Sequence, residues 1–252
     1  MIRIVRREVV AGGLLTLFWG TKARCQISRT SDGGGCWIPH RQVASYFALA
    51  TKPSVVTSGA VRIEPRSGRP ELDRAFAQSL AMMAGTFGVL PAFTYYDDNA
   101  DRNARATPEP ILDRADGTVM FGLTMLRDLL EDATIADAAI VSVAAHEFGH
   151  IVSFKNGMIN DLVGEDGAPY RSEQFADYMS GYFSGRRKLE RPSFKAFVFV
   201  DVLGGMLGGG DHGSARQRGE AVHNGFAAAF AQKLSLDDAI QTGYRFAMSR
   251  KL

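Results

Sequence analysis

Two histidines in the middle of the chain, His146 and His150, have the spacing of metal ligands. They are the first and last residues of the sequence His-Glu-Phe-Gly-His. Positions i and i+4 of an α-helix lie on one face. Both imidazoles can therefore point at one ion and form half of a tetrahedral zinc site. Glu147 follows His146 directly, where its carboxylate can reach a water on the metal without being a ligand. The pattern predicts a metal site with its own general base.

A second pair, Glu173 and Asp177, repeats the i, i+4 spacing and supplies two carboxylates. A catalytic zinc needs a third protein ligand and an open position for water. Six residues after His150 stands Asn156, which excludes a third histidine at that place. Glu173 is therefore the expected third ligand, and Asp177 can accept the second N–H of a zinc-bound histidine. Without the histidines upstream, the two acids would indicate only an exposed helix face.

Together the His-Glu-x-x-His and Glu-x-x-x-Asp elements resemble the gluzincin zinc peptidases, and within them the HtpX/Oma-like and neutral zinc metallopeptidase groups. Two further stretches agree with that resemblance. Residues 103–106 (Asn-Ala-Arg-Ala) resemble the entry to the strand along which these enzymes bind substrate, and residues 211–218 resemble a late element with one histidine and one arginine. The resemblance covers about residues 70–232 in the same order.

The resemblance implies an α+β, zincin-like fold with a small mixed sheet, a metal-binding helix beneath it and a mostly helical C-terminal half. It implies a zinc-dependent endopeptidase that holds one zinc ion with His146, His150 and Glu173 and uses Glu147 as the general base. The substrate would be a protein or peptide that pairs with the edge of a hairpin near residues 104–123.

By the same resemblance, His212 leans over the metal and stabilises the oxyanion, while Arg218 buttresses the helix and the site. An ordinary loop histidine is the alternative for His212, since Gly213 stands where one of the groups has proline. Three tyrosines are near the site in sequence and are candidates to donate a hydrogen bond to substrate: Tyr170, Tyr178 and Tyr182. His223 is interpreted as structural, and His40 as a surface or packing residue.

Two other functions remain open. The chain could bind zinc and a partner protein without cleaving it, as an envelope chaperone or assembly protein. The general base Glu147 argues against that hypothesis, because a non-catalytic protein does not need it. Alternatively, a zinc hydrolase of this kind could cleave an amide that is not a peptide bond.

The first 25 residues read as a bacterial export signal. Arg6 and Arg7 precede an apolar run of signal-peptide length (residues 9–19), in a pattern that resembles a twin-arginine signal. This predicts a periplasmic or secreted protein, with an N-terminal membrane anchor as the alternative. Removing five basic residues and one acid changes the formal charge from +2 to −2, which excludes an electrostatic argument for nucleic acid or anionic membranes.

Of the rest of the chain, residues 26–69 are hard to interpret, and residues 70–252 should form the catalytic domain. Cys36 is left without a cysteine partner and receives no role. The acidic stretch of Asp97, Asp98 and Asp101 predicts a solvated turn, with a calcium or substrate loop as the alternative. The apolar residues 194–207 are interrupted by Asp201 and are too few to span a bilayer, so a buried or interface helix is expected.

Hydrophobic periodicity and turn signals place the other elements. We expect a helix from Pro70 with one apolar stripe, and a metal helix from Thr134, as its N-cap, to Gly157. The remaining elements are expected to be a strand at 92–97, a hairpin whose strands are 111–112 and 117–123, and helices at 123–130, 214–233 and 236–248.

Overall fold

The computed structural model describes residues 63–64, 66–98, 102–113, 115–165, 167–206 and 212–251. The expected export signal, almost all of the 26–69 segment including His40 and Cys36, and the glycine run 208–210 lie outside these ranges. The expectations for them stay predictions.

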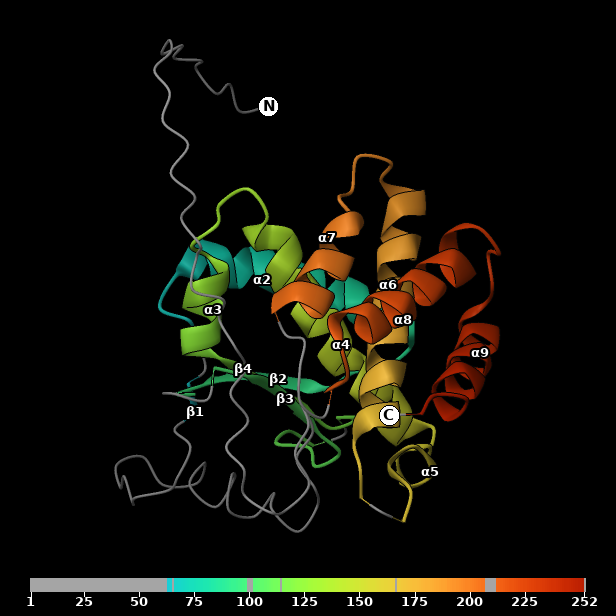
Figure 1. Cartoon of the computed structure of the whole chain (residues 1–252). Helices are drawn as coiled ribbons and strands as arrows, with labels where there is room; N and C mark the ends of the chain where they lie inside the picture. The colour runs from blue at the N-terminus through green and yellow to red at the C-terminus, as the bar shows by residue number, and fades with distance from the viewer. Residues whose placement is uncertain are drawn as a thin grey trace.

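Four short strands form a mixed sheet: β1 (Ile63–Glu64), β2 (Ala92–Tyr96), β3 (Ala104–Thr107) and β4 (Thr118–Gly122). Their order is β1-β2-β4-β3, with β2 and β4 parallel and the two outer pairs antiparallel (Figure 1). Among the described residues, β3 therefore forms one edge of the sheet. With the helices that follow, this sheet confirms the α+β class.

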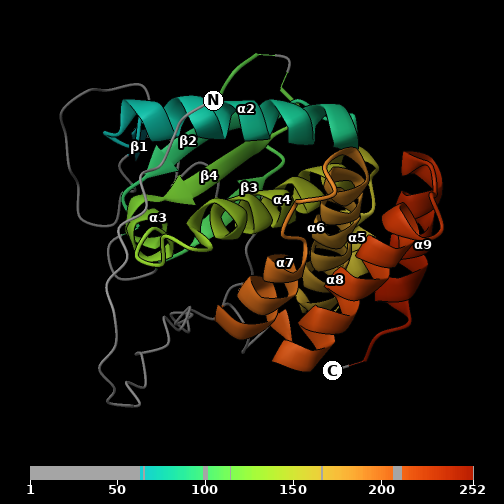
Figure 2. The same cartoon turned by 90° about the horizontal axis from the view of Figure 1, so that it is seen from above.

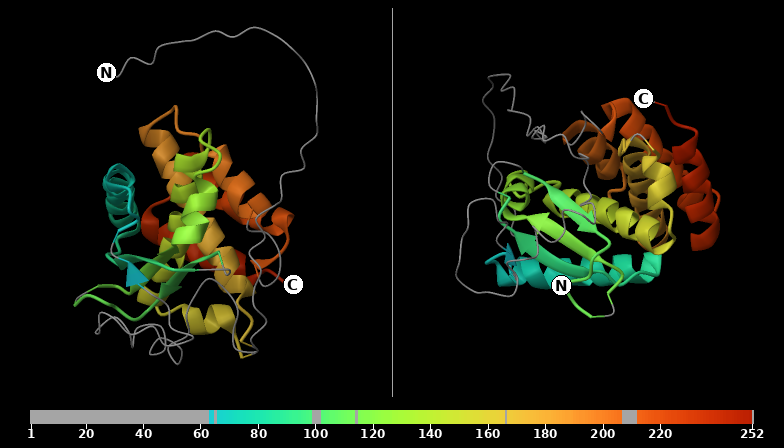
Figure 3. Two further views of the ribbon diagram at one scale, coloured as in Figure 1. Left: turned by 90° about the vertical axis from the view of Figure 1, so that its left-hand side faces the viewer. Right: turned by 90° about the horizontal axis from the view of Figure 1, so that it is seen from below.

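One face of the sheet carries the core because side chains alternate along a strand. The ring of Phe76, from helix α2 (Pro70–Phe87), lies 5.3 Å from the ring of Phe93 and 5.6 Å from that of Phe121. Figures 1 and 3 show that α3 (Leu123–Leu129) and α4 (Ala136–Lys155) lie over the same face as α2. The metal helix thus rests on the sheet and its edge strand.

Helix α2 follows the sequence prediction. It begins at Pro70 and is closed by Gly88 in the left-handed conformation (φ 62°). Phe76, Met83 and Phe87 of the expected stripe are buried, and Leu72 and Leu80 pack against the core from its margin.

Asp98 is not part of a solvated turn, contrary to the sequence prediction. Its carboxylate is buried and accepts hydrogen bonds from the backbone N–H groups of Thr124 (2.7 Å) and Met125 (3.0 Å). These are unsatisfied donors at the start of α3, so Asp98 caps that helix from a distant part of the chain. The cap is invisible in sequence because 26 residues separate Asp98 from Thr124.

The predicted hairpin exists, but its first strand was misplaced. Strand β4 pairs antiparallel with β3 (Ala104–Thr107) and not with residues 111–112. The hydroxyl of Thr118 donates to the carbonyl of Glu109 (2.7 Å) and accepts from the N–H of Ile111 (3.1 Å), which wraps this stretch into a loop. Prolines at positions 108 and 110 disfavour a strand there.

Helix α4 starts one residue later than a Thr134 N-cap predicts. Its N-cap is Ile135, which makes no side-chain cap, and the hydroxyl of Thr134 donates instead to Asp132 (2.6 Å). The other end agrees with the prediction: Gly157 is left-handed (φ 67°), and the N–H of Met158 reaches back to the carbonyl of Ser153.

The C-terminal half is helical, as expected. Helix α6 packs between α4 and α8 (Figure 2). Within the expected apolar helix, α7 and η1 follow one another without a break from Phe197 to Met206, and Phe197 is 64% exposed while Phe199 is buried. In the described ranges no helix is long and apolar enough to cross a membrane. The elements are α5 (Ile159–Val163), α6 (Tyr170–Glu190), α7 (Phe197–Asp201), η1 (Val202–Met206), α8 (Ala215–Phe230) and α9 (Leu236–Met248).

Candidate metal centre

Helices α4 and α6 bring His146, His150 and Glu173 together in the core. One donor atom from each lies within 4.8 Å of the other two, and all three residues are buried. Nε2 of His146 is 3.1 Å from one oxygen of the Glu173 carboxylate, and Nε2 of His150 is 3.5 Å from the other. Two imidazoles and one carboxylate that converge in this way could hold a metal ion.

Gly149, between the two histidines, lets α4 and α6 approach closely. A Cβ atom at this position would lie 2.8 Å from Cα of Ala176 and 3.0 Å from its carbonyl oxygen, both backbone atoms of α6. Any side chain would therefore push the helices apart and withdraw Glu173 from the histidines. Sequence analysis did not single out this glycine, although a glycine in a helix interior is a recognised sign of close packing.

Asp177 and Arg218 hold His146 from behind. Nδ1 of His146 lies 2.8 Å from Oδ1 of Asp177, which fixes which ring nitrogen faces the ligand group. The buried guanidinium of Arg218, from α8, donates to both oxygens of that carboxylate, at 2.8 Å and 2.6 Å. Burial lowers the pKa of His146, but the Asp177 and Glu173 carboxylates outweigh burial and raise that pKa to about 10.

His150 is held by a neutral group instead. Its Nδ1 lies 3.2 Å from the hydroxyl of Ser172, the residue before Glu173. Burial is the main reason why the pKa of His150 is lowered, so the ring is neutral at neutral pH. Sequence reasoning missed Ser172, and its position next to a candidate ligand was the only available signal.

Glu147 lies in the core beside the ligand group but is not part of it. Burial raises the pKa of its carboxyl to about 8, and Glu173 adds to that shift while His146, Arg105 and Arg218 oppose it. One of its oxygens, Oε2, is buried and makes no hydrogen bond. A carboxylate with a pKa near neutrality and an unused oxygen has the properties of a general base.

His212 reaches the same site from the segment before α8. Its Nε2 lies 3.2 Å from Oε2 of Glu173, and burial lowers its pKa to about 4, so the ring is neutral. The side-chain amide of Gln174 donates to the His212 carbonyl at 3.3 Å. Gly213 has φ +90°, which proline cannot adopt, so the chain leaves His212 by a path that a proline would forbid.

Of the three tyrosines, Tyr170 is next to the segment that carries His212. A Cβ at Gly213 would lie 2.7 Å from the Tyr170 ring, and the buried phenol oxygen makes no hydrogen bond. Tyr182 donates to the carbonyl of Leu234 (3.1 Å), and the ring of Tyr178 packs on Phe246 of α9. The last two therefore stabilise the C-terminal helices. His223 is exposed and lies outside the ligand group.

The donor set fits a metal ion in its chemistry as well as its geometry. Nε2 of His150 and Oε2 of Glu147 are buried without hydrogen bonds, which is costly unless another group satisfies them. Burial opposes the ionised form of Glu173, but the surrounding histidines hold its pKa well below the usual range, so it is a carboxylate at neutral pH. Two imidazoles and an ionised carboxylate suit zinc, among other divalent ions.

Comparison with known proteins gives no relative. No protein-family model, no curated protein and no solved structure matches the chain.

Proposed function

We propose that this protein is a zinc-dependent peptidase of the gluzincin type with a zincin-like fold. The single observation that carries the proposal is the buried group His146–His150–Glu173 with the carboxylate of Glu147 beside it. A site that only stored a metal would have no use for a buried acid whose pKa is raised to about 8. The resemblance of both sequence motifs to the gluzincins supports the same conclusion.

Zinc held by these three residues would supply a Lewis acid that polarises a carbonyl and lowers the pKa of a coordinated water towards about 7. Glu147 then takes a proton from the attacking water on its carboxylate and delivers it to the leaving amine. The neutral His212 donates a hydrogen bond to the developing oxyanion. Asp177 and Arg218 keep the His146 ring in one tautomer and orientation throughout.

The substrate is a polypeptide in extended conformation. Strand β3 lies at the edge of the described sheet and packs on α4, which carries Glu147. An extended peptide can add to such an edge through main-chain hydrogen bonds, so that its carbonyl groups run past the metal helix. The sequence pattern of residues 1–25, which resembles an export signal, favours a periplasmic or secreted location for this activity.

The test is zinc content and casein hydrolysis of the purified chain, as wild type and as Glu147→Gln. We expect one zinc per chain in both proteins and cleavage only by the wild type, because the amide cannot accept the proton. Asp161→Asn is the matched control, since that carboxylate is on α5 and accepts only from the exposed Tyr244 hydroxyl.

Other outcomes identify the alternatives. Equal cleavage by Glu147→Gln would remove the proposed base. Zinc in both proteins without cleavage of casein or peptides would favour a zinc-binding chaperone or assembly protein, or a hydrolase for another amide. Absence of zinc from both would overturn the ligand assignment itself.

A further inference from the structure

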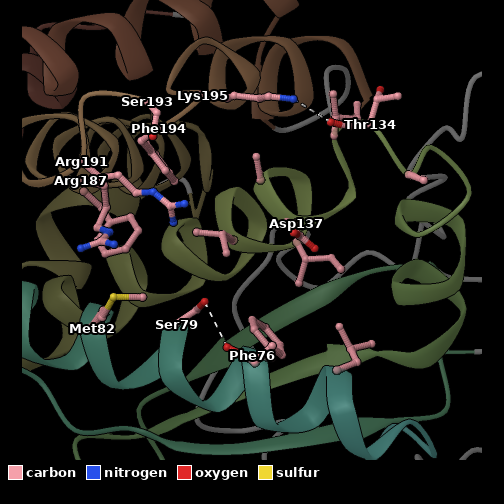
Figure 4. A pocket seen from close by; sticks show the side chains of 18 residues that line it. Phe76, Ser79, Met82, Thr134, Asp137, Arg187, Arg191, Ser193, Phe194 and Lys195 are labelled. Atoms are coloured by element: carbon pink, nitrogen blue, oxygen red, sulfur yellow. Dashed lines mark hydrogen bonds between the residues drawn. The ribbon is translucent and has the colours of Figure 1, made fainter. Parts of the chain in front are cut away.

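A cavity of about 370 Å³ lies away from the metal centre, between α2, the first turns of α4 and the end of α6 (Figure 4). The same two helices, α4 and α6, thus contribute to both sites, and along α6 the two sites are far apart. Glu173 is in the first turn of α6, whereas Arg187 of the cavity is 14 residues later, about 21 Å along the helix axis. The cavity is therefore separate from the proposed catalytic centre.

The body of the cavity is apolar. Its walls include the rings of Phe76, Phe183 and Phe194, and the side chain of Ile140. Met82 of α2 stands at the wall and is 38% exposed. A concave site of this size with mostly hydrophobic walls and a few polar groups is typical of small-molecule pockets and too small for a folded partner.

Three cationic side chains line the cavity, and among the described residues Arg187 pairs with Glu190. Lys195 keeps its charge and donates to the carbonyl of Thr134 (3.2 Å), on the other side of the cavity from Arg191 (Figure 4). Arg191 makes no ion pair in the described part of the chain, and Figure 4 shows its guanidinium directed into the cavity.

The charge balance of the whole lining indicates the kind of ligand. Three cations line the cavity, and Asp137 in the lining and Glu190 beside it oppose them, which leaves one positive charge. A planar guanidinium matches a carboxylate in a two-point contact. One net charge suits a monoanion better than a phosphate dianion.

We propose that this cavity binds a small amphiphile with one carboxylate on an aliphatic chain, such as a medium-chain fatty acid. The carboxylate pairs with Arg191, and the chain lies between α2 and α4 against Phe76, Phe183 and Met82. Binding there joins α2 to the α4–α6 pair without touching a metal ligand. The inference does not depend on whether the metal centre cleaves peptides.

Isothermal titration of the full chain with octanoate tests the proposal, with Arg191→Gln as the main variant. We expect one saturable site, weakened on the order of tenfold or more by Arg191→Gln because a charge-assisted contact is lost. Arg216→Gln is the matched control, since Arg216 is an exposed arginine on α8, and octanoate affinity should not change. Met82→Glu should also weaken binding, because it puts a negative charge on the wall.

Changes in the ligand separate charge from apolar contact. From hexanoate to octanoate, affinity should rise by up to about fourfold per added CH₂. 1-Octanol should bind at least about tenfold more weakly than octanoate, since it lacks the charge. No saturable octanoate binding, equal binding by Arg191→Gln, or equal binding of 1-octanol would overturn the proposal. Tighter binding of octyl phosphate would overturn the choice of a monocarboxylate, and Glu147→Gln should bind octanoate like the wild type.

Discussion

The two histidines of the candidate metal group have hydrogen-bond partners of different kinds: a carboxylate for His146 and a hydroxyl for His150. Behind His146 stands an ionic chain, Asp177 and then Arg218, that links α4 to α6 and α8. Behind His150 stands only the hydroxyl of Ser172, a neutral partner on α6. Both supports fix a ring orientation, but only the first brings buried charges that must remain paired.

Because of this difference, the two supports should contribute unequally to the folding stability of the protein, although both orient a histidine ring. A buried ion pair becomes costly as soon as one partner is removed, because the other charge is left without compensation. A neutral hydrogen bond contributes about 1 kcal/mol and leaves no charge behind when it is lost. The His146 side should therefore be sensitive to substitution in both folding and metal binding, and the His150 side in metal binding alone.

The largest expected effect is that of Arg218→Met. It leaves the Asp177 carboxylate buried without its guanidinium, and we expect a loss of about 3–5 kcal/mol in the free energy of unfolding. Urea denaturation in the presence of a chelator measures this loss without any contribution from metal binding. Arg216→Met, two residues earlier on α8 and exposed, is the control and should cost less than about 1 kcal/mol. Equal effects of the two variants would contradict the ionic support.

Asp177→Asn tests the same side through metal affinity. The amide keeps the size of the side chain but loses the charge that favours the correct tautomer and basicity of His146, so zinc affinity should fall about 10–100-fold. Competition with a chelator of known affinity measures the change on the folded protein. If Asp177→Asn bound zinc as well as the wild type, the carboxylate would not be the support that fixes His146.

Ser172→Ala should have a smaller effect. Loss of one neutral hydrogen bond of about 1 kcal/mol corresponds to roughly fivefold weaker zinc binding, with little change in unfolding free energy. Ser184→Ala is the matched control, because Ser184 is also buried on α6 and donates only to the carbonyl of Gly181 (2.8 Å). A Ser172→Ala defect as large as that of Asp177→Asn would remove the distinction between the two sides.

The smallest effect concerns the end of α4 beyond His150. There Lys155 donates to Asp116 (3.1 Å), whose carboxylate also accepts from the N–H of Leu90 (2.7 Å). Burial alone would raise the pKa of Asp116, but these two donors outweigh it and lower the pKa from 3.8. The pKa of Asp116 is lower in the folded than in the unfolded state. Its contribution to the free energy of unfolding is therefore complete above about pH 3.8 and is lost as the pH falls through the pKa of the folded state.

Comparison of the wild type with Asp116→Asn in urea at several pH values tests this contribution. The variant should be less stable by up to about 1 kcal/mol near pH 6, and the difference should shrink below pH 3.8. Zinc affinity at neutral pH should not change, because Asp116 touches no ligand. A difference that grew as the pH fell would contradict the assigned sign.

Sequence reasoning found the groups that recur at fixed spacings and missed those that are joined only by folding. The i, i+4 pairs His146–His150 and Glu173–Asp177 were visible because helix geometry is local. Ser172 and Gln174 were missed, since a single polar residue carries no periodicity. For the same reason Asp98 was expected in a solvated turn, while the helix that it caps begins 26 residues away.

The strands show the same limit. Local propensity placed β4, but the partner strand was assigned to Ile111 and Leu112 because they are apolar and close in sequence. The pairing of Ala104–Thr107 with β4 was fixed by register across the sheet, together with the Thr118 hydroxyl that holds the intervening loop. Thr134 likewise suits an N-cap by type, but its hydroxyl is satisfied by Asp132.

Gly149 has a consequence for any attempt to make this protein more robust. A glycine in a helix interior lowers helix stability by about 1 kcal/mol relative to alanine, so Gly149→Ala is an obvious choice for thermal stabilisation. The added methyl group would lie 2.8 Å from Cα of Ala176. Helix α4 would gain helical propensity, but it could no longer pack so closely against α6. The residue that weakens the helix on its own is thus the one that an engineer should leave unchanged.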